Sequence, residues 1–152
     1  MTNPTDLASQ YRIPADRYYE SQHHMWAKPI AGSKRVVVGI DALGLAAMGD
    51  LAYVAFRQVG TEVTRADSFG TLEAAKMTGD LYSPISGKII EVNADVLKKP
   101  SIVNDDPYEK GWLVIIEATD WENESRSLIS GDKLPNWIAG ETERYRNQGW
   151  IR

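Results

Sequence analysis

Short runs of β-branched and large apolar residues recur through the middle of the chain. The clearest runs are RVVVGI at 35–40, LAYVAF at 51–56, KIIEV at 88–92 and WLVIIEA at 112–118. Each run is bounded by turn-forming residues, a pattern typical of short buried or half-buried strands. Strands of this length at such close spacing predict a mainly β fold, either a sandwich or a barrel.

Two segments have helical patterns instead. Asp41 has the chemistry of an N-cap, ALGLAAM follows it, and Gly49 is suited to end the helix. Near the C-terminus, DWENESRSLIS and LPNWIAGETERYRNQGW have helical spacing. The predicted face of the second segment carries Trp137, Ile138, Glu141 and Tyr145. We therefore expect one short internal helix and a C-terminal helical segment whose apolar side packs on the β core.

The stretch GTLEAAKMTGDLYSP at 70–84 combines conflicting signals. Its residues 73–76 favour a helix, yet glycines stand at both ends, at Gly70 and Gly79. An isolated helix shorter than roughly 12–15 residues is marginal in water. We therefore predict a β-hairpin over 70–83 with Ala75 and Lys76 at its tip, and a close backbone approach at Gly70.

Composition narrows the class of protein. The chain has 152 residues, a net charge of -4 and no cysteine. These totals predict one domain over 1–152, with a polar lead-in at 1–17, a core at about 18–118 and a C-terminal helical extension at 119–152. No basic patch suggests nucleic acid, and no apolar run suggests a membrane span or a secretory signal, so a cytoplasmic location is expected.

Several stretches between Tyr18 and about Glu117 occur in the order and spacing of a known family: HMWAK, VVVGI, MGDLAYV, GTEVTRADSFGTLEAAK, DLYSPISGKIIEVN and VNDDPYEKGWLVIIEA. By these stretches the sequence resembles the H protein of the glycine cleavage system. The resemblance implies a barrel-sandwich hybrid of the lipoyl/biotinyl type, with lipoic acid joined to Lys76 through an amide. Biotinyl proteins have methionine on both sides of their lysine, whereas here only Met77 is present and Ala75 precedes. A biotinyl carrier and an unmodified interaction module therefore stay open as less favoured alternatives.

The resemblance also marks residues around the lysine. Glu73 resembles part of the surface that a lipoylating enzyme reads, although a solvated charge on a strand edge explains it equally well. Asp80 matches a family carboxylate four residues after the lysine. The family's early His-Glu-Trp pattern reads His24-Met25-Trp26 here. Met25 would give the arm's cleft a polarizable wall suited to sulfur or hydrocarbon rather than to a cation.

Histidine and acidic residues do not predict a metal site. His23 and His24 are the two histidines of a chain without cysteine, so a zinc centre is not expected. They are interpreted as polar residues beside the cleft, one of which could influence the protonation of a reduced lipoyl thiol, and His24 is counted among the residues of the cofactor site. The sequence contains no catalytic grouping, and the chain is predicted to be a carrier rather than an enzyme.

Met25 and the long C-terminal tail distinguish this chain from the usual H protein. In both features the chain resembles the lipoate-binding proteins of bacterial sulfur oxidation. The favoured interpretation is therefore a carrier of sulfur intermediates that works with a heterodisulfide-reductase-like complex. The alternative is an aminomethyl carrier that serves the glycine cleavage enzymes. Either role implies two further partners: a lipoate-protein ligase or lipoyl synthesis enzymes to load the arm, and dihydrolipoamide dehydrogenase to reoxidise it.

Overall fold

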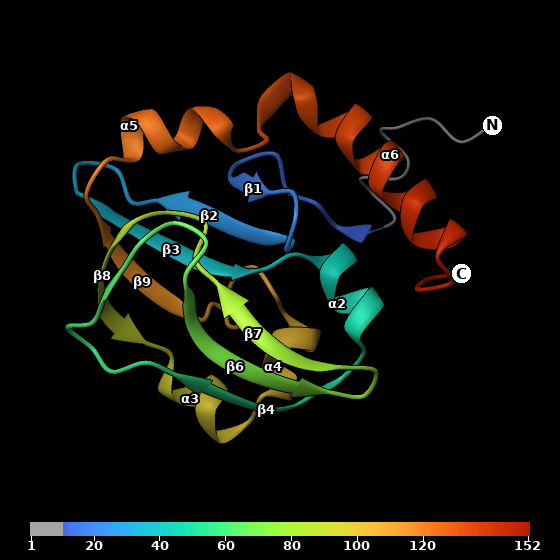
Figure 1. The fold of residues 1–152 in the computed structure, drawn as a ribbon, viewed down its shortest axis with the longest axis horizontal. Helices are drawn as coiled ribbons and strands as arrows, with labels where there is room; N and C mark the ends of the chain where they lie inside the picture. Colours follow the sequence, from blue (N-terminus) through green and yellow to red (C-terminus); the bar gives the residue numbers. More distant parts are fainter. Residues whose placement is uncertain (1–10) are drawn as a thin grey trace.

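The computed structural model describes residues 11–152, so most of the predicted lead-in at 1–17 lies outside the described residues. Two antiparallel sheets face each other, and a helical C-terminal segment crosses the outer side of the larger sheet (Figure 1). The predicted mainly β architecture with a C-terminal helical segment is confirmed. Within the described part of the chain, no helix combines the length and apolar character needed to cross a bilayer.

The larger sheet has six strands in the order β1-β2-β3-β9-β8-β5. Its strands are β1 (Tyr18–Glu20), β2 (Met25–Pro29), β3 (Arg35–Ile40), β5 (Glu62–Val63), β8 (Gly87–Val92) and β9 (Val114–Ala118). In the register of β2 against β3, Trp26 lies opposite Gly39. A Cβ at Gly39 would lie 2.4 Å from the Trp26 indole, so glycine leaves room for this ring.

The smaller sheet has the order β4-β6-β7 and carries the predicted hairpin. Its strands are β4 (Leu51–Phe56), β6 (Ser68–Ala74) and β7 (Thr78–Tyr82). The close approach expected at Gly70 is present, because a Cβ there would lie 2.2 Å from the Ala55 carbonyl oxygen. Only a residue without a side chain lets β4 and β6 pair this closely.

The helices divide between predicted and unpredicted elements. The expected internal helix is α2 (Ala42–Met48), capped by the Asp41 carboxylate, which accepts from the Gly44 amide. The C-terminal helices are α5 (Trp121–Glu124) and α6 (Leu134–Asn147), joined by the 3-10 turns η1 (Ser125–Ser127) and η2 (Gly131–Lys133). Two short helices, α3 (Ala94–Lys98) and α4 (Ser101–Asp105), were not predicted, since five residues are too few for a periodic signal.

Buried apolar side chains form two clusters. The first lies between the sheets and includes Val38, Phe69, Leu72, Ile89 and Ile116. The second lies under α6 and includes Ile13, Tyr19, Trp26, Leu43, Ile138 and Tyr145. Trp26 therefore packs in the layer between the larger sheet and α6, where its indole N–H donates to the Pro107 carbonyl at 3.1 Å.

Candidate functional site

Lys76 lies at the exposed tip of the β6–β7 hairpin, where β6 has ended at Ala74 and β7 begins at Thr78. Helix propensity at residues 73–76 is overridden because Glu73 pairs in register with Tyr53 on one side and Thr78 on the other. The hairpin at 70–83 and its predicted tip are thus found in the structure.

The tip is held in place by the end of α2. The Lys76 amide donates to the Met48 carbonyl, and the Ala75 amide donates to the Asp50 carbonyl, each at 3.0 Å. Between these two acceptors Gly49 has φ +81, and a Cβ there would lie 3.1 Å from the Ala75 Cβ. The backbone of the tip is therefore fixed while the Lys76 side chain stays exposed.

A cavity of about 500 Å³ adjoins Lys76. Three regions supply most of its wall: the hairpin, α2, and the last turn of α6 with the residues that follow it. Its lining residues are Gln22, His23, Met25, Ile40, Gly44, Ala47, Met48, Leu72, Lys76, Met77, Asp80, Leu81, Tyr82, Tyr145, Gly149 and Trp150. Its size lies in the range of pockets for small ligands and cofactors.

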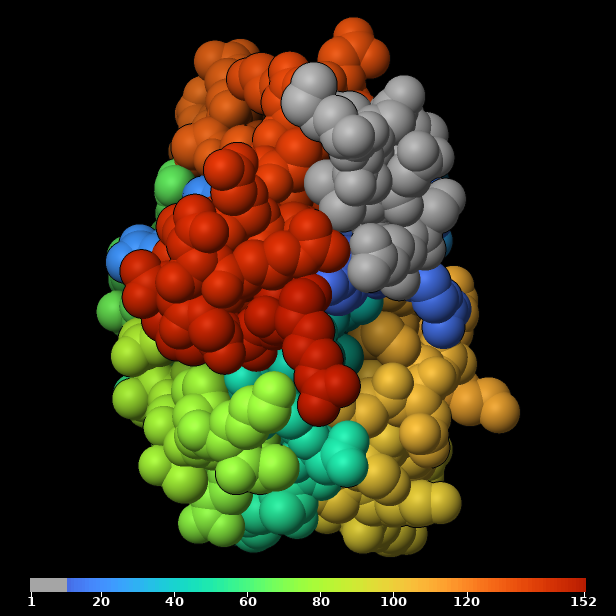
Figure 2. All heavy atoms as spheres, turned by 90° about the vertical axis from the view of Figure 1, so that its right-hand side faces the viewer, coloured from blue at the N-terminus to red at the C-terminus, as the bar shows by residue number. Residues whose placement is uncertain are grey.

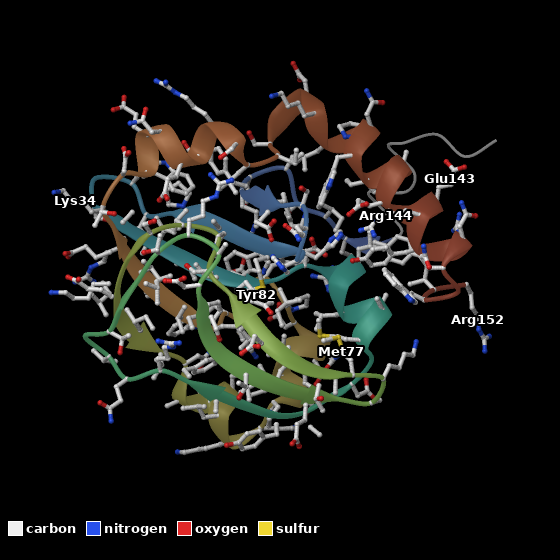
Figure 3. The ribbon with its side chains drawn as sticks, in the orientation of Figure 1. Lys34, Met77, Tyr82, Glu143, Arg144 and Arg152 are labelled. Atoms are coloured by element: carbon white, nitrogen blue, oxygen red, sulfur yellow. The ribbon has the colours of Figure 1, made fainter. Side chains whose placement is uncertain are left out.

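The lining is rich in thioethers and aromatic rings. Met25 lies on β2, Met48 on α2 and Met77 at the hairpin tip. Figure 3 shows Met77 at the α2 end of the hairpin, with Tyr82 farther along β7. Such groups favour hydrocarbon and sulfur. The cavity therefore fits a lipoyl arm, whose hydrocarbon chain ends in a dithiolane. The Lys76 Nζ lies 3.4 Å from the Ala46 carbonyl oxygen, at the cavity's edge.

Three other residues predicted for the site differ in where they lie relative to the cavity. Met25 is buried and lines the cavity. Asp80 is exposed, contributes to the lining, and accepts a hydrogen bond from the Ser68 hydroxyl at 3.0 Å. Glu73 is exposed on the outer surface of the smaller sheet and does not line the cavity.

His24 does not line the cavity, contrary to its placement beside the cleft. Its ring is 1% exposed and lies between two carboxylates: Nδ1 is 2.8 Å from Asp41, and Nε2 is 2.8 Å from Glu141. The reason is local, because His24 has φ +58 and its side chain leaves the strand pattern just before β2. The adjacent His23 lines the cavity instead.

The two carboxylates define the charge of His24. Both ring nitrogens face acceptors, so both must carry a proton. Burial by itself would lower the pKa of His24, but Asp41 and Glu141 outweigh it and raise the pKa to about 9. Burial would likewise raise the pKa of Glu141, but hydrogen bonds from His24 and Arg144 lower it to about 2. A cationic imidazole thus joins α2, β2 and α6.

The sequence predicts neither this network nor most of the cavity wall. From the sequence, Asp41 is predicted only to cap a helix, and Glu141 only to lie on a helical face. Arg17 is also buried, with its guanidinium 4.7 Å from the Trp26 ring centroid and 5.1 Å from that of Tyr108. No local pattern marks these contacts, because they depend on how separate segments of the chain pack together.

Comparisons with known proteins agree with the geometry. The family model described as "Glycine cleavage H-protein" matches residues 17–140. A glycine cleavage system H protein of Alcanivorax borkumensis is 42% identical over 129 residues, covering 85% of this chain and 98% of the relative. That of Carboxydothermus hydrogenoformans is 36% identical over 131 residues, covering 86% and 98%.

Solved structures give the same result. The crystal structure of a glycine cleavage system H protein from Mycobacterium marinum superposes with a TM-score of 0.72 at 32% identity. The match covers 86% of this chain and 99% of that protein. Glycine cleavage H proteins carry lipoic acid on a lysine and act as carriers rather than enzymes. The chain belongs to the glycine cleavage H-protein family.

Proposed function

We propose that this protein is a lipoyl carrier with its arm on Lys76, and that it carries the aminomethyl group of glycine cleavage. The observation that carries the proposal is an exposed lysine at a fixed hairpin tip, beside a cavity whose wall suits a dithiolane. Its partners would be the decarboxylase, the aminomethyltransferase, dihydrolipoamide dehydrogenase and an enzyme that loads lipoate.

The properties of the tip suit attachment and transfer. Lysine is long and unbranched, and amide formation removes its charge. The bound group supplies the sulfur chemistry, which a chain without cysteine lacks, while the protein supplies position. Glu73 is exposed three residues from Lys76 and belongs to the surface that we assign to the loading enzyme. Asp80 is the carboxylate available at the cavity for a cationic aminomethyl group.

A second candidate is the sulfur-carrying role that the sequence interpretation placed first. The named relatives are glycine cleavage H proteins, and they favour the aminomethyl role. The observation that still supports sulfur is Met25, which lies against the cavity where the family pattern has glutamate. A buried thioether offers a cation no charge partner, whereas it packs well against sulfur.

Attachment is tested by the intact mass of protein isolated from its native host. We expect one lipoyl adduct on Lys76 and none on Lys76→Arg. A biotinyl adduct would support the biotin alternative, and unmodified protein would contradict the proposal.

The cargo is tested by the exchange of glycine with carbon dioxide, catalysed by glycine decarboxylase in the presence of the lipoylated protein. The aminomethyl role predicts exchange with the unaltered chain. Exchange that requires Met25→Glu would support the sulfur role instead. Met25→Gln controls for loss of the thioether, and Met77→Glu controls for a carboxylate placed elsewhere on the cavity wall.

A further inference from the structure

The chain does not stop at the end of α6 but turns back on the helix. The amide of Trp150 donates to the Tyr145 carbonyl, and the amide of Gly149 donates to the Arg146 carbonyl, both at 3.0 Å. Gly149 has φ +76. This pair of hydrogen bonds with a left-handed glycine is the Schellman motif. It places Trp150 beside the last turn of the helix, and we call residues 145–150 the C-terminal hook.

Aromatic and cationic contacts hold the hook together. The rings of Tyr145 and Trp150 meet edge to face at 5.1 Å between centroids. The Arg144 guanidinium lies 5.0 Å from the Tyr145 ring centroid and 5.8 Å from that of Trp150. The Arg144 side chain is itself fixed, because its Nε donates to Glu141 at 2.7 Å and that carboxylate also binds His24. The hook is therefore linked to the buried imidazole.

The hook faces the region of the lysine. Tyr145, Gly149 and Trp150 line the same cavity as Lys76 and Met77. In the space-filling view, α6 and the chain end lie directly over α2 and the β6–β7 hairpin (Figure 2). Tyr145, Gly149 and Trp150 all follow residue 140, where the match to the family model ends. This wall of the cavity therefore comes from residues outside the range that the family model matches.

The Schellman contact explains only part of the environment of Trp150. A large apolar side chain after the helix normally covers the last turn, and Tyr145 receives that contact. Yet 45% of Trp150 stays exposed, although it lines an apolar cavity. An indole held rigidly at the edge of such a cavity has a free surface that an apolar group can cover.

We propose that Trp150, positioned by the C-terminal hook, is the aromatic wall against which the sulfur end of the Lys76-linked arm rests. This inference depends on the proposed lipoylation at Lys76. A dithiolane is apolar and polarizable, and sulfur packs favourably on aromatic rings. Trp150 is thus a positioning residue, which shelters the arm between transfers and holds it in the cavity rather than in solvent.

The test uses lipoylated protein and measures how fast the dithiolane is reduced by a water-soluble phosphine. Samples are quenched with N-ethylmaleimide and their intact mass is read. Removing one sulfur–aromatic contact should raise the rate by about two- to tenfold in Trp150→Ala. Trp150→Phe should retain most of the protection. Trp121→Ala, on α5 and outside the cavity lining, should leave the rate unchanged.

A second measurement needs no variant. Magnetization transfer between the Trp150 indole protons and the dithiolane ring protons should be observed in the unaltered lipoylated protein. Equal reduction rates in Trp150→Ala and the unaltered chain, or the absence of that transfer, would overturn the assignment of Trp150. Protein that carries no lipoyl group would instead contradict the proposed function.

Discussion

The β-sandwich and the C-terminal helix are held to the same part of the molecule by different means. The space between the two sheets is filled by aliphatic and aromatic side chains, and backbone pairing sets the position of the hairpin. Under α6, an aromatic cluster surrounds a charged network in which His24 binds Asp41 and Glu141. Apolar packing is insensitive to pH, whereas a buried ion network depends on every partner and on its protonation.

This difference separates the two halves of the proposed site. Lys76 is placed by the pairing of β6 with β4 and β7, and by amide hydrogen bonds from the tip to Met48, at the end of α2, and to Asp50, just before β4. The wall formed by Tyr145 and Trp150 is placed by α6, and through Glu141 it depends on the buried imidazole. The lysine should therefore keep its position under conditions that detach the wall.

The largest effect is expected from His24→Ala, which removes the cation from between two carboxylates. Asp41 is fully buried and would lose its charge partner, so the free energy of unfolding should fall by about 3–5 kcal/mol. Urea denaturation measures the fall, and hydrogen exchange should show α6 losing protection before β6 and β7. His23→Ala removes a half-buried ring paired with Glu20 and should change stability by less than about 1 kcal/mol. Equal losses in the two variants would contradict the role given to the network.

A smaller loss is expected in the sandwich from Gly70→Ala. The added Cβ would meet the Ala55 carbonyl oxygen at 2.2 Å and force β4 and β6 apart, which should cost about 1–3 kcal/mol. The matched control is Gly140→Ala on α6, where a Cβ meets nothing within 4 Å. That change should stabilise the protein by about 0.5–1 kcal/mol, because alanine favours helix over glycine. Thermal unfolding of both variants measures the difference, and a stable Gly70→Ala would show that the strands separate easily.

A pH titration should affect the α6 layer and spare the sandwich. The folded pKa of His24, about 9, lies above its ordinary 6.5, so its contribution is complete below pH 6.5 and is lost as pH rises through 9. Its neighbour Tyr145 stays neutral in that range because burial raises the pKa of its phenol, and Glu141 stays charged because its pKa is lowered to about 2. The neutral ring keeps one N–H donor and turns its other nitrogen to a carboxylate without a proton, so the loss linked to this pKa shift should reach up to about 3 kcal/mol.

At low pH the same interaction is lost when Glu141 takes up a proton. Its folded pKa of about 2 lies below the ordinary 4.5, so its contribution is present above pH 4.5 and is lost as pH falls through 2. Protection of α6 amides followed against pH measures both limits. In His24→Gln the alkaline loss should disappear, and its persistence would assign the effect to another group.

The smallest effect on stability is expected at the position proposed for function. Lys76→Arg alters an exposed side chain at the hairpin tip, so the free energy of unfolding should change by less than about 0.5 kcal/mol. Lipoylation should nevertheless be lost completely, as intact mass would show. A large loss of stability would mean that the lysine packs as part of the fold.

The β-sandwich and the α6 layer also differ in how much of each could be predicted from the sequence. The hairpin at 70–83 was predicted because turn residues and paired strands outweigh the helix propensity of residues 73–76. The short helix after Asp41 was predicted from its cap and its stop. The location of Met25 beside Lys76 came from a family resemblance, and His24 was placed in the cleft because no local signal shows that its backbone leaves the strand pattern.

The sequence alone determined the strands, the hairpin and an exposed lysine at its tip, because strand periodicity and turn chemistry are local properties. Only the tertiary structure decided which groups meet: His24 is 17 positions from Asp41 and 117 from Glu141. Trp150 and Lys76 line one cavity only because α6 runs from the outer side of the larger sheet down toward α2. Contacts between residues so distant along the chain depend on how elements pack, and no local pattern encodes that packing.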